Sequence, residues 1–289
     1  MQEEVIFQSA GLKLSGVLEF PRDYAAGRKR PAIIVIHGFG SNKEGANVRE
    51  PAAIYTDAGY IALRFDMRSC GASEGEAGRI ICLEQVEDTR NAISYLASRP
   101  EVDATRIALS GTSAGAAISI YTGGLDPRVA AVISAGGWGN GERKLEGQHP
   151  APGAWARFKE MLEQGRAHRA STGKSLMVSR YDIVPIPLAM RGSLPPGSVM
   201  EFPVETAQSI YDFRPEDMLP KLAPRPLLLL HAAHDSVTPT SESIELFRRA
   251  QPPTELHLFH GVDHFMLGER NPRVTDVLRG WLAAYFPVN

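Results

Sequence analysis

The sequence predicts an α/β fold with a mostly parallel central sheet that is flanked by helices. Short apolar runs alternate along the chain with segments whose apolar residues recur at helical spacing. This alternation is typical of strands joined by helical crossovers, which bury both faces of a parallel sheet. A length of 289 residues suits one large domain, or a core domain with an insertion. The predicted strands cover residues 32–36, 61–65, 106–109, 129–133, 227–230 and 256–259.

The elements around these strands have their own sequence signatures. Residues 5–20 alternate between apolar and polar side chains and favour an antiparallel β lead-in. The last helix has Asn271 as an N-cap and Pro272 in its first turn. Its apolar stripe consists of Val274, Val277, Leu278, Trp281, Leu282 and Tyr285. The other predicted helices cover residues 47–58, 83–96, 114–121 and 241–250.

Composition and charge exclude several classes of protein. Hydrophobic residues make up 43% of the chain, which excludes a disordered or fibrous protein. The net charge of −2 predicts no binding to nucleic acid or to an anionic membrane. No apolar run is long enough for a membrane span, and the acidic N-terminus lacks the pattern of a signal peptide. Because two cysteines are too few for a disulfide framework, we expect a cytoplasmic protein. A homodimer is considered as its assembly.

One segment interrupts the alternation of strands and helices. Residues 150–226 hold 11 of the 21 prolines of the chain, and proline is unfavourable inside a central strand. We therefore expect a core formed by residues 1–137 and 218–289, with an inserted cap or lid formed by residues 138–217. Because the insertion follows the strand at 129–133, it is expected above the carboxyl ends of the strands, where open α/β sheets bind ligands.

A serine nucleophile is indicated by one of two Gly-x-Ser-x-Gly motifs. Residues 111–115 read Gly-Thr-Ser-Ala-Gly, between the strand at 106–109 and a helix of small residues. A strand before the serine and a helix after it are what a nucleophile elbow requires. The second motif, around Ser73, has loop-like sequence on both sides. The sequence therefore predicts Ser113 as the nucleophile.

A serine needs a base within hydrogen-bond reach and an acid that orients this base. His264 follows the last predicted strand, and Asp235 follows the strand at 227–230, so both are expected at the carboxyl edge of the sheet. Asp263 is an alternative acid, but adjacent residues in an extended chain point apart. No metal site is predicted, because the histidines lack the spacing of known metal-binding motifs.

An oxyanion hole is predicted beside Ser113. Residues 37–40 read His-Gly-Phe-Gly directly after the strand at 32–36, and the glycines let backbone amides face a substrate oxygen. The expected donors are the backbone N–H groups of Phe39 and Ala114. His37 is interpreted as packing this loop rather than as the general base.

The sequence resembles the α/β-hydrolase superfamily, because its motifs follow one another along the chain in the order of that family. Within the superfamily it is similar to dienelactone-hydrolase-like and serine-aminopeptidase-like bacterial esterases. The resemblance rests on residues 37–40, the Asp-Met-Arg turn at 66–68, the elbow at 111–115, Asp235, and Gly-Val-Asp-His at 261–264. It implies an α/β-hydrolase fold with a lid inserted after the sixth strand. Serine stands at position 69, where glycine is common in the family, so a reshaped turn is expected there.

The predicted activity is that of a serine hydrolase that acts on a small-molecule acyl substrate, with no cofactor. A carboxylic ester is the expected bond, and the alternatives are an amide or peptide, a thioester, a carbon–carbon bond, or acyl transfer to an acceptor other than water. A receptor or interaction module on the same fold is the alternative from another class. The segment from residue 157 to residue 191 contains seven basic and three acidic residues. This excess of positive charge suggests either an anionic substrate or a solvent-exposed helix surface. The candidate substrate contacts are Trp138, Trp155, Arg157 and Tyr181.

Overall fold

The computed structural model describes residues 1–289 and contains an eight-stranded sheet with the order β1-β2-β4-β3-β5-β6-β9-β10. The first two strands pair antiparallel and the remaining pairs are parallel, except for the antiparallel pair β2–β4. This arrangement confirms the predicted fold class. The strands are β1 (Gln2–Ser9), β2 (Leu12–Glu19), β3 (Arg30–Ile36), β4 (Ile61–Phe65), β5 (Val102–Thr112), β6 (Val129–Ala135), β9 (Leu227–Ala232) and β10 (Thr254–Phe259).

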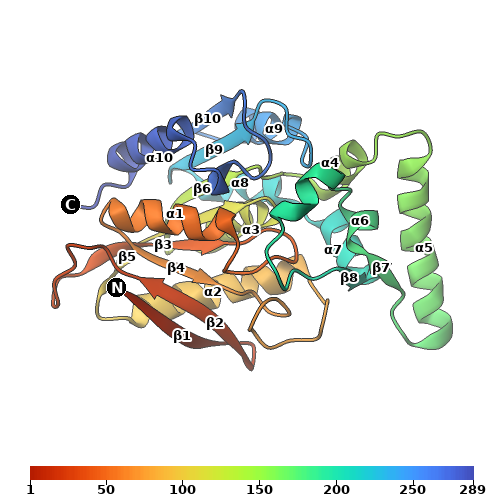
Figure 1. The fold of residues 1–289 in the computed structure, drawn as a ribbon, viewed down its shortest axis with the longest axis horizontal. Coiled ribbons are helices and arrows are strands. Elements are labelled where there is room, and N and C mark those ends of the chain that lie inside the picture. The colour runs from red at the N-terminus through yellow and green to blue at the C-terminus, as the bar shows by residue number, and fades with distance from the viewer.

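Helices cover both faces of the sheet (Figure 1). Side chains of β3 alternate between the faces, so Ile33 packs with helices on one side and Ile34 on the other. The first face is covered by α1 (Ala46–Asp57) and α10 (Pro272–Tyr285), whose N-cap Asn271 accepts a hydrogen bond from the Arg273 backbone as predicted. The opposite core contains residues of α2 (Cys82–Ser98), α3 (Ala114–Leu125), α8 (Leu219–Leu222) and α9 (Ser241–Arg249).

The chain between β6 and β9 builds a group of short elements at one end of the sheet, with α5 outermost (Figure 1). Its β structure is a single antiparallel pair of three-residue strands, β7 and β8, as expected from its proline content. The elements are α4 (Gly141–Gln148), α5 (Ala154–Thr172), β7 (Met177–Ser179), α6 (Arg180–Ile183), β8 (Glu201–Pro203) and α7 (Val204–Asp212). The 3₁₀ turns of the chain are η1 (Leu188–Ser193), η2 (Pro215–Met218) and η3 (Met266–Gly268).

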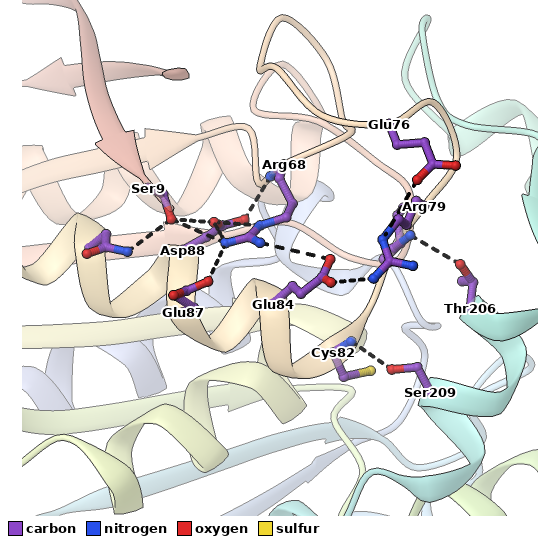
Figure 2. A network of polar contacts seen from close by, with 12 residues as sticks. Ser9, Arg68, Glu76, Arg79, Cys82, Glu84, Glu87, Asp88, Thr206 and Ser209 are labelled. Atoms are coloured by element: carbon purple, nitrogen blue, oxygen red, sulfur yellow. Dashed lines mark hydrogen bonds and ion pairs between the residues drawn. The ribbon is translucent and has the colours of Figure 1, made fainter. Parts of the chain in front are cut away.

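This group of elements is hydrogen-bonded to the first turn of α2. The N-cap of α2 is Ile81, which has no side chain that can accept a hydrogen bond. Two hydroxyl groups of α7 accept from backbone groups on either side of it: Thr206 Oγ1 accepts from the Ile80 N–H at 3.1 Å and Ser209 Oγ from the Cys82 N–H at 2.8 Å. Figure 2 shows both contacts reaching across from α7. The N–H of Cys82, the first residue of the helix, has no partner inside the helix and is thereby satisfied from outside it.

The loop after β4 is fixed by two buried carboxylates. Asp88 of α2 accepts hydrogen bonds from the Arg68 backbone at 2.9 Å and from its guanidinium at 2.7 Å, as Figure 2 shows. Asp66 forms an ion pair with Lys43 at 2.7 Å. Ser69 adopts a φ of 65°, so a serine here keeps the left-handed turn that glycine favours. Arg68 therefore holds this loop against α2.

Candidate functional site

Ser113 lies on a strained turn between β5 and α3. Its φ of 55° and ψ of −120° are unfavourable for a residue with a side chain, which is typical of a nucleophile elbow. The flanking glycines permit this close crossing. A Cβ atom at Gly111 would lie 2.1 Å from the Gly115 carbonyl oxygen, and one at Gly115 would lie 2.4 Å from the Ile36 carbonyl oxygen. The motif at 111–115 is thus required by backbone packing.

The second Gly-x-Ser-x-Gly motif lies elsewhere. Ser73 Oγ donates to the Asp66 carbonyl oxygen at 2.5 Å and accepts from the Ser15 N–H at 2.8 Å. Both contacts belong to the loop after β4 and to β2, so the Ser73 hydroxyl is used in fixing the loop.

His264 and Asp235 meet at the carboxyl edge of the sheet. His264 Nδ1 lies 2.8 Å from Asp235 Oδ2, and the other carboxylate oxygen accepts from the Val237 and Thr238 N–H groups at 2.8 and 2.7 Å. Burial raises the pKa of Asp235, but the charges and hydrogen bonds of the histidines that face it outweigh this effect and lower it. Asp263 instead accepts from Ser236 at 2.8 Å, so it does not orient the His264 ring.

A second histidine, His231, contacts the same carboxylate, and the sequence analysis did not predict this contact. His231 at the end of β9 is fully buried, with Nε2 at 3.2 Å from Asp235 Oδ2 and 3.1 Å from the Thr238 carbonyl oxygen. Because both neighbours only accept hydrogen bonds, Nε2 carries a proton. Its Nδ1 lies 2.6 Å from Ser243 Oγ, whose hydroxyl donates to it when the ring is neutral. His231 therefore holds the same oxygen of Asp235 that contacts His264.

The residues predicted for the oxyanion hole come from the loop after β3 and from the start of α3. A Cβ atom at Gly38 would lie 3.3 Å from Ser113 Cβ, so this loop passes close to the elbow. Ala114 is the first residue of α3, where backbone N–H groups lack partners inside the helix and favour negative charge. His37 is buried, with Nδ1 at 2.8 Å from the Gly38 carbonyl oxygen and Nε2 accepting from the Met67 N–H. It fixes the loop, as interpreted from the sequence.

A cavity connects these groups. Its lining includes Phe39, Ser113 and His264, together with Thr112 at the end of β5 and with Val237 and Phe265 from neighbouring loops. The chain between β6 and β9 closes it with Arg180, Val184, Ile186, Leu194 and Pro195. The cavity wall is therefore largely apolar, and Arg180 is the cation within it.

The structure does not bring the four predicted substrate contacts into this cavity, which corrects the sequence interpretation. Trp138 is buried against the edge of the Phe213 ring, with ring centroids 5.7 Å apart. Tyr181 lies beneath the Arg191 guanidinium, at 3.6 Å from the ring centroid. Both aromatic residues are used in packing, because the chain between β6 and β9 joins α2 and α3 in one shared apolar cluster.

Trp155 and Arg157 belong to α5, the helix farthest from the sheet in Figure 1. The Trp155 ring stacks on Phe158 of the same helix at 5.4 Å, and Arg157 is exposed. Other basic residues of α5 pair with acidic neighbours, as Arg169 does with Glu205 at 3.0 Å. The basic residues of α5 therefore lie on a solvated helix face. Arg180 of the same basic stretch instead lines the cavity, and the sequence did not reveal this position.

No group of three or more histidine, cysteine, aspartate or glutamate side chains has an arrangement that would hold a metal ion. No helix combines the length and the apolar character needed to cross a membrane.

A mostly parallel eight-stranded sheet with a strained serine between a strand and a helix is the arrangement of α/β hydrolases. The sequence profile of the alpha/beta hydrolase family matches residues 33–277, and the chain belongs to this family. The resemblance to the α/β-hydrolase superfamily found in the sequence motifs is thereby confirmed.

Several characterised proteins are similar to the chain. The acyltransferase drtE of Aspergillus calidoustus is 28% identical over 284 residues, which is 92% of this chain and 89% of that protein. The polyketide transferase ATR5 of Stachybotrys chlorohalonatus is 38% identical, over 46% of this chain and 43% of that protein. The α/β hydrolase GrgF of Penicillium sp. sh18 has a similar fold, with a TM-score of 0.79, 22% identity and 99% coverage of both chains.

Proposed function

We propose that the protein is a serine hydrolase that cleaves a small-molecule carboxylic ester through an acyl-enzyme intermediate. The observation that carries this proposal is that Ser113, on its strained turn, lines the same cavity as His264, whose ring is hydrogen-bonded to Asp235. A nucleophile, a base and an acid in this chain order are what acyl transfer by an α/β hydrolase requires. Residues 138–217 act as a lid over this cavity.

In the first step, Ser113 Oγ attacks the substrate carbonyl carbon and His264 accepts the hydroxyl proton. Asp235 holds the imidazole through Nδ1 and stabilises its charged form. The N–H groups of Phe39 and Ala114 hold the oxygen that becomes negative, which typically contributes about 3 kcal/mol per donor. His264 then gives the proton to the leaving alcohol, and a water molecule releases the acid in the reverse sequence of proton transfers. None of these steps requires a cofactor.

Acyl transfer, or cleavage of a thioester, is the second candidate. Two relatives that align over more than nine-tenths of this chain are named acyltransferase drtE and, at 26% identity, thiohydrolase aneE of Aspergillus aculeatus. The tetrahedral intermediate is the same for an ester and a thioester, so the Ser113 machinery suits both bonds. The acceptor that removes the acyl group separates a hydrolase from a transferase.

The two serines in Gly-x-Ser-x-Gly motifs offer a matched test. We expect Ser113→Ala to abolish both ester turnover and labelling by a fluorophosphonate, whereas Ser73→Ala keeps both, because Ser73 only fixes a loop. A panel of acyl esters, thioesters, anilides and β-diketones, with and without added alcohol or amine acceptors, identifies the bond and the acceptor. Retained labelling of Ser113→Ala would remove Ser113 from the role of nucleophile.

A further inference from the structure

Arg180 joins the lid to the loop that carries the predicted oxyanion donor. It is the first residue of α6, and its side chain is 2% exposed. Nη2 donates to the Phe39 carbonyl oxygen, and Nη1 donates to the carbonyl oxygens of Gly40 at 3.4 Å and Val199 at 2.7 Å. One guanidinium thus bonds two consecutive carbonyl groups of the oxyanion loop.

Further contacts fix the same loop from the lid. The Val199 N–H donates to the Gly40 carbonyl oxygen at 2.8 Å, and the Phe39 ring stacks on Phe202 at 4.5 Å. Gly40 has a φ of 52°, and a Cβ atom there would lie 2.8 Å from Phe202 Cζ and 2.9 Å from Arg180 Nη1. The glycine therefore leaves room for the arginine and the phenylalanine to reach the loop.

The charge of Arg180 has no carboxylate partner. The side chain forms no ion pair, and its Nε is buried without a hydrogen-bond acceptor. Burial lowers the pKa of Arg180 to about 10, which still leaves the group protonated at neutral pH. An unpaired buried cation is unfavourable for stability and is retained where it serves another purpose. Here it lines the cavity that also contains Ser113 and His264.

We propose that Arg180 is a positioning residue for the oxyanion hole, delivered by the lid. By holding the carbonyl groups of Phe39 and Gly40 it fixes the two peptide planes that follow Phe39. The plane that carries the Phe39 N–H is held at its other end, where the Gly38 carbonyl oxygen lies 2.8 Å from His37 Nδ1 and accepts from the Ser41 N–H at 3.2 Å. Arg180 thus keeps the loop from turning on the C-terminal side of Phe39, so the Phe39 N–H stays directed at the substrate oxygen. Its unpaired charge adds a positive potential where the oxyanion develops, and such preorganised charge acts on the transition state more than on the ground state. This inference rests on the proposed serine hydrolase function.

The test compares Arg180→Met and Arg180→Lys with the wild type and with Arg166→Met, an exposed arginine of the same lid. We expect Arg180→Met to lower kcat about 100-fold, the effect of losing one oxyanion donor, with KM changed less than about twofold. The affinity for a boronic acid analogue of the transition state falls in parallel. Arg180→Lys keeps the charge but not the fork of donors, so we expect about a tenfold loss in kcat. Arg166→Met keeps the wild-type constants.

Each other outcome has a distinct meaning. Wild-type kcat in Arg180→Lys, or in a folded Arg180→Met, would overturn the proposal. An increase in KM that is confined to carboxylate-bearing substrates would also overturn it, because Arg180 would then bind substrate instead of positioning the loop. If Arg180→Met does not fold, as judged by its thermal unfolding, the lysine variant decides. Failure of the proposed function itself is recognised separately, by a wild-type protein whose turnover and fluorophosphonate labelling do not depend on Ser113.

Discussion

Removal of the His231 donor is expected to change how strongly Asp235 supports His264. The variant His231→Phe keeps a ring in the buried site but lacks the Nε2 proton that lies 3.2 Å from Asp235 Oδ2. Without this donor the carboxylate holds more of its charge on the oxygen that contacts His264 at 2.8 Å. The charged form of the His264 ring is then stabilised relative to the neutral form, so less of the neutral base is present at a given pH.

The magnitude follows from the geometry of the shared proton. A hydrogen bond to a charged acceptor contributes about 1.5–3 kcal/mol, and Nε2 divides its proton between Asp235 and the Thr238 carbonyl oxygen, so the lower end applies. This bond is present whether His264 is neutral or charged, so only part of its free energy enters the protonation of His264. Since about 1.4 kcal/mol equals one pH unit, the acid limb of the kcat/KM profile is expected to lie higher by less than about one unit. Two other buried groups, Thr238 and Ser243, lose their partner as well, which lowers the free energy of unfolding by about 2–4 kcal/mol.

The assay is the pH dependence of kcat/KM between pH 5 and pH 9 for the wild type, His231→Phe and His231→Gln, together with urea unfolding. An amide in the glutamine variant still donates toward Asp235, so its acid limb is expected between those of the other two proteins. A stable phenylalanine variant with an unmoved acid limb would refute the view that His231 acts through Asp235.

Three further changes test other parts of the structure. Gly115→Ala places a Cβ atom 2.4 Å from the Ile36 carbonyl oxygen and is expected to lower the free energy of unfolding by about 1–3 kcal/mol, whereas Gly280→Ala, with open space around it, does not lower it. Burial lowers the pKa of His37, so below about pH 6.5 the unfolded chain binds a proton at this residue that the folded chain does not bind. In urea unfolding, the free energy of unfolding of the wild type should therefore fall by about 1.4 kcal/mol per pH unit relative to that of His37→Gln. Arg157→Ala should leave KM unchanged for neutral and anionic esters alike, since its side chain lies on the exposed face of α5; a selective rise for anionic esters would restore it as a substrate contact.

The local parts of the fold could be predicted from the sequence. The strand at 61–65 has the predicted bounds because all its residues are buried and all but Arg64 are apolar. β5 is longer than predicted at both ends, because polar residues interrupt the apolar pattern between Val102 and Arg106 and the elbow sequence follows Leu109. α3 continues through Gly123 and Gly124, where a Cβ atom would lie 2.7 Å from Val132 and 2.4 Å from the Met218 backbone. Glycine disfavours a helix in isolation, and only the tertiary packing reveals why it stands there.

The candidate site likewise contains residues that the sequence could predict and one that it could not. The elbow at 111–115 is a local motif, and the positions of Asp235 and His264 follow from where parallel strands end. Arg180 could not be found in this way, because its partner Phe39 lies 141 residues away and no local pattern joins them. The aromatic residues expected near substrate were misjudged for a related reason: a large apolar side chain in an insertion is needed for that insertion's own packing, which sequence alone does not distinguish from substrate binding.

The hydroxyl groups of α7 at the start of α2 bear on how lids are exchanged among enzymes of this fold. Thr206 and Ser209 satisfy backbone donors of Ile80 and Cys82 that the core leaves open. A chimera that receives a foreign lid without such hydroxyls inherits a frayed first turn of α2, at about 1 kcal/mol for a missing cap. A serine or aspartate at position 81 would accept from the N–H of residue 83 or 84, so it would stabilise the start of α2 without replacing the two lost bonds. Exchange of lids is therefore expected to require hydroxyl groups at the positions of Thr206 and Ser209, or a new N-cap at position 81 as compensation.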